Sequence, residues 1–230
     1  MSANSESGGP HSREEASILD VVPVEWSWGN VLVTGPAMVG KQEIAIDLLT
    51  TAHRAGGQPL AITTADTADQ LRHAYHEAGG EETEGLAVVN CLTGSDGASD
   101  DDWTRTVGSP GDFTGIAMAV SEVFDSVSPR RRSGTRVLVD NLATSLMYAD
   151  IEPTYRFVHA LAGRVSDAGG VLIATLDTDG IEPADNRALV GLFDTVVEVR
   201  RADDSTEFSV SGAPDTTDEW YRVPSGGVSS

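Results

Sequence analysis

The sequence has almost no cysteine and no long apolar run. Cys91 is the only cysteine among 230 residues, so an intramolecular disulfide is excluded and a reducing, cytoplasmic environment is expected. We interpret Cys91 itself as a small apolar filler near a strand end. No run approaches the roughly 18 apolar residues that a membrane span needs, and the N-terminus lacks the apolar core of a signal peptide. We therefore expect no membrane association.

Positive charge is also scarce. Thirty-six acidic residues face fifteen basic ones, which gives a formal net charge of −21. A nucleic-acid-binding surface needs clustered positive charge, so this composition disfavours a nucleic-acid partner. Lys41 is the only lysine, and acidic residues combined with arginine are typical of proteins from halophiles that accumulate salt. In molar salt the Debye length shrinks to about 3 Å, so charge repulsion is tolerable. An acidic protein from an ordinary cell is the alternative.

The remaining composition is that of a globular domain. The hydrophobic fraction is 40%, which is ordinary for a chain that buries a core. Residues 1–20 are polar and acidic and are expected to form a disordered tail. We expect one folded domain over residues 21–212 and a polar C-terminal tail over residues 213–230.

Short apolar segments alternate with segments of helical periodicity. Strands are expected at residues 31–34, 59–63, 86–89, 136–139 and 170–175, and helices at 41–54, from about 67, from about 113 and over 154–167. An antiparallel strand pair is predicted for residues 195–200 and 207–210, joined by a turn at Asp203-Asp204. This alternation predicts an α/β fold with a mostly parallel sheet, helices on both faces and a C-terminal antiparallel strand pair.

A glycine-rich segment joins the first expected strand to the first expected helix. It has the spacing G-x-x-x-x-G-K, in the order Gly35, Pro36, Ala37, Met38, Val39, Gly40 and Lys41. Backbone N–H groups in such a loop hold phosphate oxygens, and the lysine reaches the β and γ phosphates. That the only lysine stands at this position strengthens the prediction of an ATP-binding site. A simple glycine turn between strand and helix is the alternative.

The position after the lysine departs from the motif. Phosphate-loop enzymes carry Ser or Thr there, and its hydroxyl binds Mg²⁺, whereas this chain has Gln42. A carboxamide oxygen can bind a metal, but the longer side chain alters the geometry that Mg²⁺ requires. The sequence therefore predicts nucleotide binding and places ordinary Mg²⁺-dependent hydrolysis in doubt.

A candidate metal ligand follows another apolar strand. Asp140 comes directly after Arg136-Val137-Leu138-Val139, as expected for an aspartate that holds the metal at the carboxyl end of a parallel strand. Many strands also end in an aspartate at a turn, which is the alternative here.

Together these segments resemble the RecA superfamily, in particular its KaiC/GvpD-like branch and small RecA-like or KaiC-like haloarchaeal proteins. The resemblance extends from about Trp28 to Val210 and depends mainly on the glycine-rich loop. It implies a RecA-like sheet and ATP as ligand. It also implies a catalytic glutamate just after the second strand, where this chain has Ala65 followed by Asp66. Asp66 is a candidate substitute base, or simply a helix cap, and losing a general base costs about 10²–10⁴ in rate.

Each of the remaining candidate functional residues has two interpretations. Arg130-Arg131-Arg132 is either a solvated loop or, in an assembly of subunits, a source of arginine fingers. Trp26 and Trp28 are either core residues or base-stacking residues, with the core favoured. The histidines show no metal-ligand spacing.

Three functions follow from these observations. The first is a regulatory RecA/KaiC-like protein that binds ATP with weak or no hydrolysis and associates with itself or with a protein partner. The second is an adaptor that binds a protein and no nucleotide. The third is an active ATPase that uses Asp66 as its base and Gln42 in an unusual role.

Overall fold

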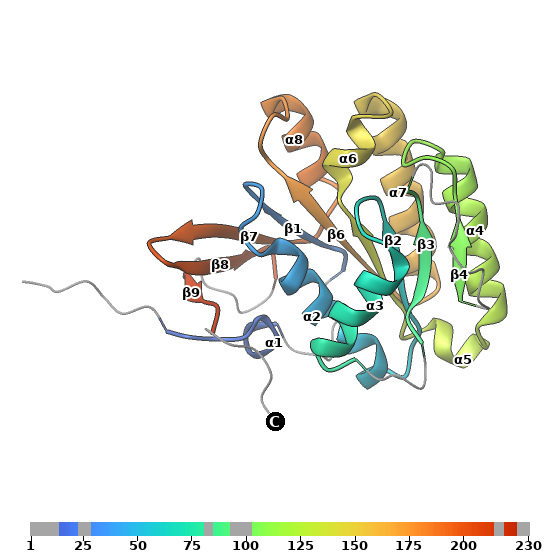
Figure 1. The fold of residues 1–230 in the computed structure, drawn as a ribbon, viewed down its shortest axis with the longest axis horizontal. Coiled ribbons are helices and arrows are strands. Elements are labelled where there is room, and N and C mark those ends of the chain that lie inside the picture. The colour runs from blue at the N-terminus through green and yellow to red at the C-terminus, as the bar shows by residue number, and fades with distance from the viewer. Residues whose placement is uncertain (1–13, 23–28, 81–84, 93–102, 214–218, 225–230) are drawn as a thin grey trace, which may run out of the picture.

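The computed structural model describes residues 14–22, 29–80, 85–92, 103–213 and 219–224. Its nine strands form one sheet in the order β4-β3-β2-β5-β6-β1-β7-β8-β9 (Figure 1). The strands are β1 (Val31–Gly35), β2 (Pro59–Thr63), β3 (Ala87–Asn90), β4 (Thr104–Thr106), β5 (Arg136–Asp140), β6 (Val171–Asp177), β7 (Thr195–Ala202), β8 (Ser205–Ser211) and β9 (Tyr221–Arg222).

Strand direction confirms the fold class predicted from the sequence. Strands β1 to β7 are all parallel to one another in the sheet. By contrast, β8 pairs antiparallel with β7, and β9 pairs antiparallel with β8. Figure 1 shows the β7–β8–β9 end of the sheet extending away from the helices on the side of β1. The chain therefore has a mostly parallel α/β sheet with a C-terminal antiparallel pair.

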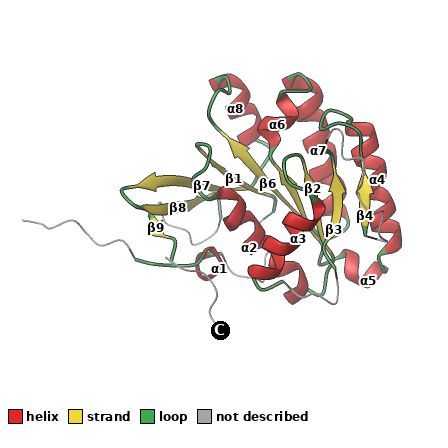
Figure 2. Cartoon of the chain, in the orientation of Figure 1, coloured by secondary structure: helices red, strands yellow, loops and turns green. Residues whose placement is uncertain are grey.

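Helices connect the parallel strands and cover both faces of the sheet (Figure 2). The connecting helices are α2 (Lys41–Arg54), α3 (Ala68–Glu77), α4 (Phe113–Ser126), α5 (Pro129–Arg132), α6 (Leu142–Leu146), α7 (Ile151–Asp167) and α8 (Pro183–Val190), and the short α1 (Ile18–Val21) precedes β1. Among the described residues, no helix has the length and apolar character that crossing a bilayer requires.

Strand alternation divides the core into two layers. In β5, Val137 and Val139 belong to the layer under α4 and α7, while Leu138 belongs to the layer under α2 and α3. Successive strand side chains point to opposite faces, and both faces are covered here, so each parallel strand is apolar at every position in its centre. This is why the expected strands read as continuous apolar runs.

Several elements differ from the expectation. Strand β6 runs two residues beyond Thr175, because Leu176 is buried and Asp177 pairs in register with Gly35 of β1. Strand β4 lies between the strand expected at residues 86–89 and the helix expected from about residue 113, where no strand is expected because Thr-Arg-Thr forms no apolar run. Residues 93–102, which precede it, lie outside the described part of the chain.

The ends of the chain also contain ordered segments. Within the tail expected over residues 1–20, Ile18 is buried against α2, and Ser17 and Asp20 form a capping box at the start of α1. Within the polar tail expected over residues 213–230, Tyr221 and Arg222 form β9. Residues 1–13, Trp26, Trp28, 214–218 and 225–230 lie outside the described residues.

Candidate functional site

The glycine-rich loop lies between β1 and α2, in the strand–loop–helix arrangement that its sequence predicts. Gly35 ends β1 so close to β7 that a Cβ there would lie 2.1 Å from the Val199 carbonyl oxygen. Gly40 precedes α2 with φ of 94°, in the left-handed region that favours glycine. The tip residue Met38 is 96% exposed. The two glycines are thus required by close packing at one end of the loop and by backbone conformation at the other.

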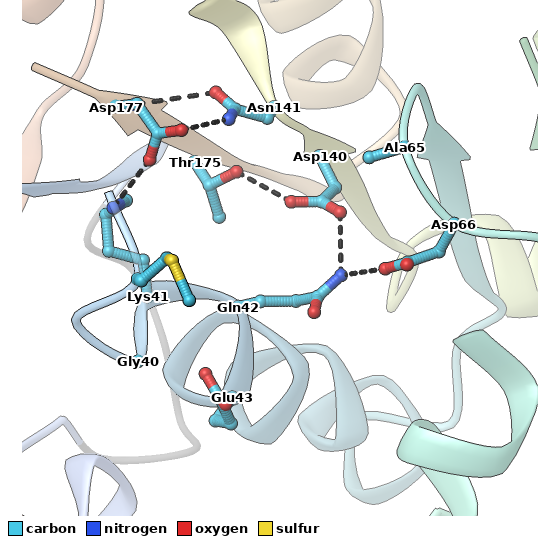
Figure 3. Close-up of a pocket in the computed structure, with 11 residues that line it drawn as sticks. Gly40, Lys41, Gln42, Glu43, Ala65, Asp66, Asp140, Asn141, Thr175 and Asp177 are labelled. Atoms are coloured by element: carbon cyan, nitrogen blue, oxygen red, sulfur yellow. Dashed lines mark hydrogen bonds and ion pairs between the residues drawn. The ribbon is translucent and has the colours of Figure 1, made fainter. Parts of the chain in front are cut away.

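Lys41 begins α2 and points into the site, where it is only 6% exposed. Its Nζ lies 2.6 Å from Asp177 Oδ1 and also donates to the Pro36 carbonyl oxygen. The other carboxylate oxygen of Asp177 accepts a 2.7 Å hydrogen bond from Asn141 Nδ2. The ammonium that would bind phosphate is therefore paired with a carboxylate that is itself positioned by an amide (Figure 3).

A second carboxylate binds the loop backbone. The N–H of Ala37 donates to Asp179 Oδ2 at 2.8 Å. Asp179 is exposed and follows β6 by two residues. Two donors of the kind that hold phosphate oxygens, one side chain and one backbone group, are thus bound to carboxylate oxygens.

Gln42 lies one residue further into α2 and bridges two other acids. Its Nε2 donates to Asp140 Oδ2 at 2.8 Å and to Asp66 Oδ2 (Figure 3). This orientation of the amide is the favourable one, because the opposite orientation would place the carbonyl oxygen against two carboxylates. A donor nitrogen therefore lies between Asp66 and Asp140.

Asp140 ends β5 and is 5% exposed. Thr175 Oγ1 donates to its Oδ1 at 2.8 Å. Burial raises the pKa of Asp140, the hydrogen bonds from Thr175 and Gln42 lower it, and the negative charges of Asp66 and Asp177 raise it further. The net direction is upward, so Asp140 is a weaker acid than an exposed aspartate.

Asp66 also points into the site, from the turn after β2 (Figure 3). The interpretation of Asp66 as a helix cap is wrong: Thr67 caps α3, with its side chain accepting from Gln70 N and the Gln70 side chain accepting from Thr67 N. Ala65 lines the same pocket and is exposed. A methyl group thus stands at the position expected for a catalytic glutamate, with a carboxylate beside it.

These residues surround a pocket of about 470 Å³ at the carboxyl ends of β1, β2, β5 and β6. That volume lies within the range of small-molecule sites. Four carboxylates line it, those of Glu43, Asp66, Asp140 and Asp177, against the single ammonium of Lys41. The charge of the pocket is therefore negative even though its loop has the form of a phosphate site.

The residues do not form a ready site for Mg²⁺. Within the described part of the chain, no cluster of three or more His, Cys, Asp or Glu side chains is arranged to hold a metal ion. Asp140 and Asp66, the acids nearest the expected metal position, are bound to an amide N–H₂ group. A metal requires lone pairs at that place, and Gln42 presents hydrogens.

Five residues of the site described above were missed in the sequence: Glu43, Asn141, Thr175, Asp177 and Asp179. The signal for the two aspartates was the acidic Thr-Leu-Asp-Thr-Asp segment directly after an apolar run. Extending the fifth expected strand by two residues would have placed Asp177 at the same edge as Lys41. Asn141 follows Asp140, and its side chain caps α6 by accepting from Ala143 N.

The other candidates lie outside the pocket. The arginines Arg130 to Arg132 belong to α5. This helix directly precedes β5, so it lies at the amino ends of the strands, whereas the pocket lies at their carboxyl ends. Cys91 is fully buried, and burial together with the nearby charge of Asp112 raises its pKa to about 12. That thiol is an inert filler, as its sequence context indicates.

Comparison with known proteins identifies the family but not the activity. A search of curated proteins finds no match. A KaiC-like protein from the hyperthermophilic archaeon Pyrococcus horikoshii has a similar structure, with a TM-score of 0.57, 16% identity, and coverage of 85% of this chain and 90% of that chain. At this identity the likeness shows a RecA/KaiC-like fold alone. A family described as being of unknown function, DUF7504, matches residues 29–199, and this chain belongs to it.

Proposed function

We propose that this protein binds ATP, or a closely related nucleotide, in the pocket beside the glycine-rich loop, and that hydrolysis there is weak or absent. The observation that carries the proposal is the direction of the loop donors. Lys41 Nζ and the Ala37 N–H both point at anionic oxygens, which are those of Asp177 and Asp179. A phosphate chain offers the same kind of acceptor to the same donors. The RecA/KaiC-like fold supports the same ligand class.

Weak turnover follows from two residues of the pocket. Gln42 replaces the hydroxyl that would bind Mg²⁺, and its amide nitrogen lies between Asp66 and Asp140. Ala65 replaces the glutamate that would activate water. Asp66 is the remaining candidate base, but its carboxylate is bound to the Gln42 amide. The combination supports a site that holds a nucleotide without an efficient route to hydrolysis.

A nucleotide that is bound and slowly released or cleaved is suited to regulation. We therefore propose a regulatory role in which the bound state controls self-association or a protein partner. The acidic composition with a single lysine supports a cytoplasmic protein of a halophilic archaeon. Light scattering with and without nucleotide tests the control of self-association. A regulatory switch requires that the nucleotide-bound and nucleotide-free forms differ in their oligomeric state.

Equilibrium binding of a fluorescent ATP analogue in molar KCl tests the main proposal. We expect saturable binding whose affinity is nearly the same with Mg²⁺ and with a chelator, because no metal ligand set is in place among the described residues. Phosphate release measured on the same sample should stay near the buffer rate. Absence of binding by a demonstrably folded protein would sink the proposal.

One observation favours a second function, an adaptor that binds a protein and no nucleotide. Four carboxylates line the pocket against one ammonium, and Asp177 and Asp179 already bind donors of the loop. The binding experiment separates this candidate directly. Phosphate release separates the third candidate, an active ATPase with Asp66 as base, since Asp66→Asn would abolish a genuine activity.

A further inference from the structure

Residues 177–179, at the end of β6 and directly after it, run alongside the glycine-rich loop and bond to it at three points. Thr178 N donates to the Gly35 carbonyl oxygen at 3.0 Å, which fixes the segment beside the start of the loop. Asp177, before it, pairs with Lys41, and Asp179, after it, accepts from Ala37 N. A short piece of chain thus binds the loop through one backbone contact and two carboxylates.

The two carboxylates differ in how firmly they are fixed. Asp177 is 28% exposed and is positioned by Asn141, whose Nδ2 donates to Oδ2 and whose Oδ1 accepts from Asp177 N at 3.4 Å. Asp179 is exposed, and the described contact of its side chain is with the loop N–H. Asp177 is therefore a built-in partner of the lysine, whereas Asp179 is the more easily displaced of the two.

We propose that Asp177 and Asp179 are internal competitors for phosphate, which keep the loop closed to anions until a polyphosphate displaces both. This inference rests on the function proposed above. Each carboxylate occupies a donor that a phosphate oxygen would use, so the anion must replace the pair at Lys41 and the bond at Ala37 together. A di- or triphosphate chain carries acceptor oxygens on separate phosphates, so we expect it to displace both carboxylates more readily than a single phosphate does.

The single lysine permits a test that needs no nucleotide. Lys41 is the only side-chain amine of the protein, so reductive methylation followed by peptide mass spectrometry reports on this residue alone beside the chain terminus. We expect Asp177→Asn to raise the labelling rate of Lys41 several-fold, because asparagine still accepts the Asn141 hydrogen bond and no longer holds the ammonium. Asp167→Asn removes the same charge from the exposed end of α7, at the amino ends of the strands and away from the pocket. This variant should leave the labelling rate of Lys41 unchanged.

Ligand binding provides the second test. In molar KCl, where screening removes long-range effects of the charge change, we expect Asp177→Asn with Asp179→Asn to bind inorganic triphosphate and the ATP analogue about tenfold more tightly than the unmodified protein. The gain for inorganic monophosphate should be clearly smaller. Asp167→Asn serves again as the matched control.

The outcomes separate the two proposals. Unchanged labelling of Lys41 in Asp177→Asn, or unchanged triphosphate affinity in the folded double variant, overturns the competitor inference. Equal gains for monophosphate and triphosphate overturn the expected preference for several phosphates. If the double variant labels faster and binds triphosphate more tightly, while no form binds the ATP analogue, the competitor inference stands and the proposed nucleotide function falls.

Discussion

Lys41 and Gln42 are neighbours in the chain but act on different sides of the pocket, because successive helix residues point about 100° apart. Lys41→Ala should lower nucleotide affinity at least about 100-fold, since it removes the charge-assisted contact to phosphate. The fold should persist, because alanine is the best helix former and Asp177 keeps its bond to Asn141. Titration with the ATP analogue, beside a melting curve, checks both parts. Unchanged affinity would mean that the loop is not a phosphate site.

Restoring two missing groups should create hydrolysis. Gln42→Thr removes the amide between Asp66 and Asp140 and supplies a hydroxyl, and Ala65→Glu supplies a base at an exposed position of the pocket. We expect the double variant to release phosphate at least about tenfold faster than the unmodified protein, a modest share of what a general base contributes. Each single variant is the control. A folded, nucleotide-binding double variant with no gain contradicts the account of the weak site.

Asp47, in the middle of α2, gives a pH-dependent term in stability. Burial, and then the like charge of Glu43 one helical turn away, raise its pKa to about 6. The folded protein keeps this proton at pH values where the unfolded chain has lost it. Stability should therefore fall as the pH rises from about 4 to about 6 and then level off. Asp47→Asn should flatten this slope and stabilise the protein by on the order of 2 kcal/mol at pH 7.

Denaturant unfolding at fixed salt across that pH range measures the effect. Asp69→Asn, at an exposed position in the first turn of α3, is the control for removing one negative charge. Equal slopes for Asp47→Asn and the unmodified protein would show that the carboxyl titrates normally.

At the scale of elements, replacing two different glycines with alanine should change the free energy of unfolding in opposite directions. Gly163 lies in α7, and a Cβ added there would have no neighbouring atom within 4 Å, so Gly163→Ala should stabilise by about 0.5–1 kcal/mol. Gly35→Ala would place a methyl group 2.1 Å from the Val199 carbonyl oxygen at the junction of β1 and β7. We expect a loss of more than about 2 kcal/mol there, since backbone must move. Melting curves of the two variants give the signs, and a tolerant Gly35→Ala would contradict the packing described.

The burial and the length of each element explain which parts of the fold the sequence could predict. The buried strands β1, β2 and β5 were found because both faces of the sheet are covered, so they are continuous apolar runs. Strand β4 and helix α6 were missed because three and five residues give too little periodicity. Lys41 and Asp140 were recognised from local motifs. The pairing of Lys41 with Asp177 was not, because it depends on the register of β1 against β6, two strands that lie far apart in the chain.

At the scale of the whole molecule, the net charge of −21 should govern stability in salt. Folding concentrates the carboxylates, and they repel one another over about 10 Å at 0.1 M salt but only about 3 Å at 1 M. We expect the melting temperature to rise by about 10 °C or more between these conditions, which corresponds to a few kcal/mol for a chain of this size. A parallel series in sucrose, which stabilises without screening, isolates the charge effect. A flat melting temperature in KCl would mean that the acidic surface is not a halophilic adaptation.

Both outer edges of the described sheet are short. Strand β4, at one edge, has three residues, and β9, at the other, has two, with a single bridge from Glu15 to Arg222 beside it (Figure 2). Molar salt screens the repulsion that otherwise keeps acidic molecules apart, which leaves unpaired strand backbone as the natural starting point for cross-β aggregation. Edge strands this short offer few consecutive N–H and C=O groups to an incoming chain, so we expect them to limit cross-β growth in molar salt, where charge repulsion is screened.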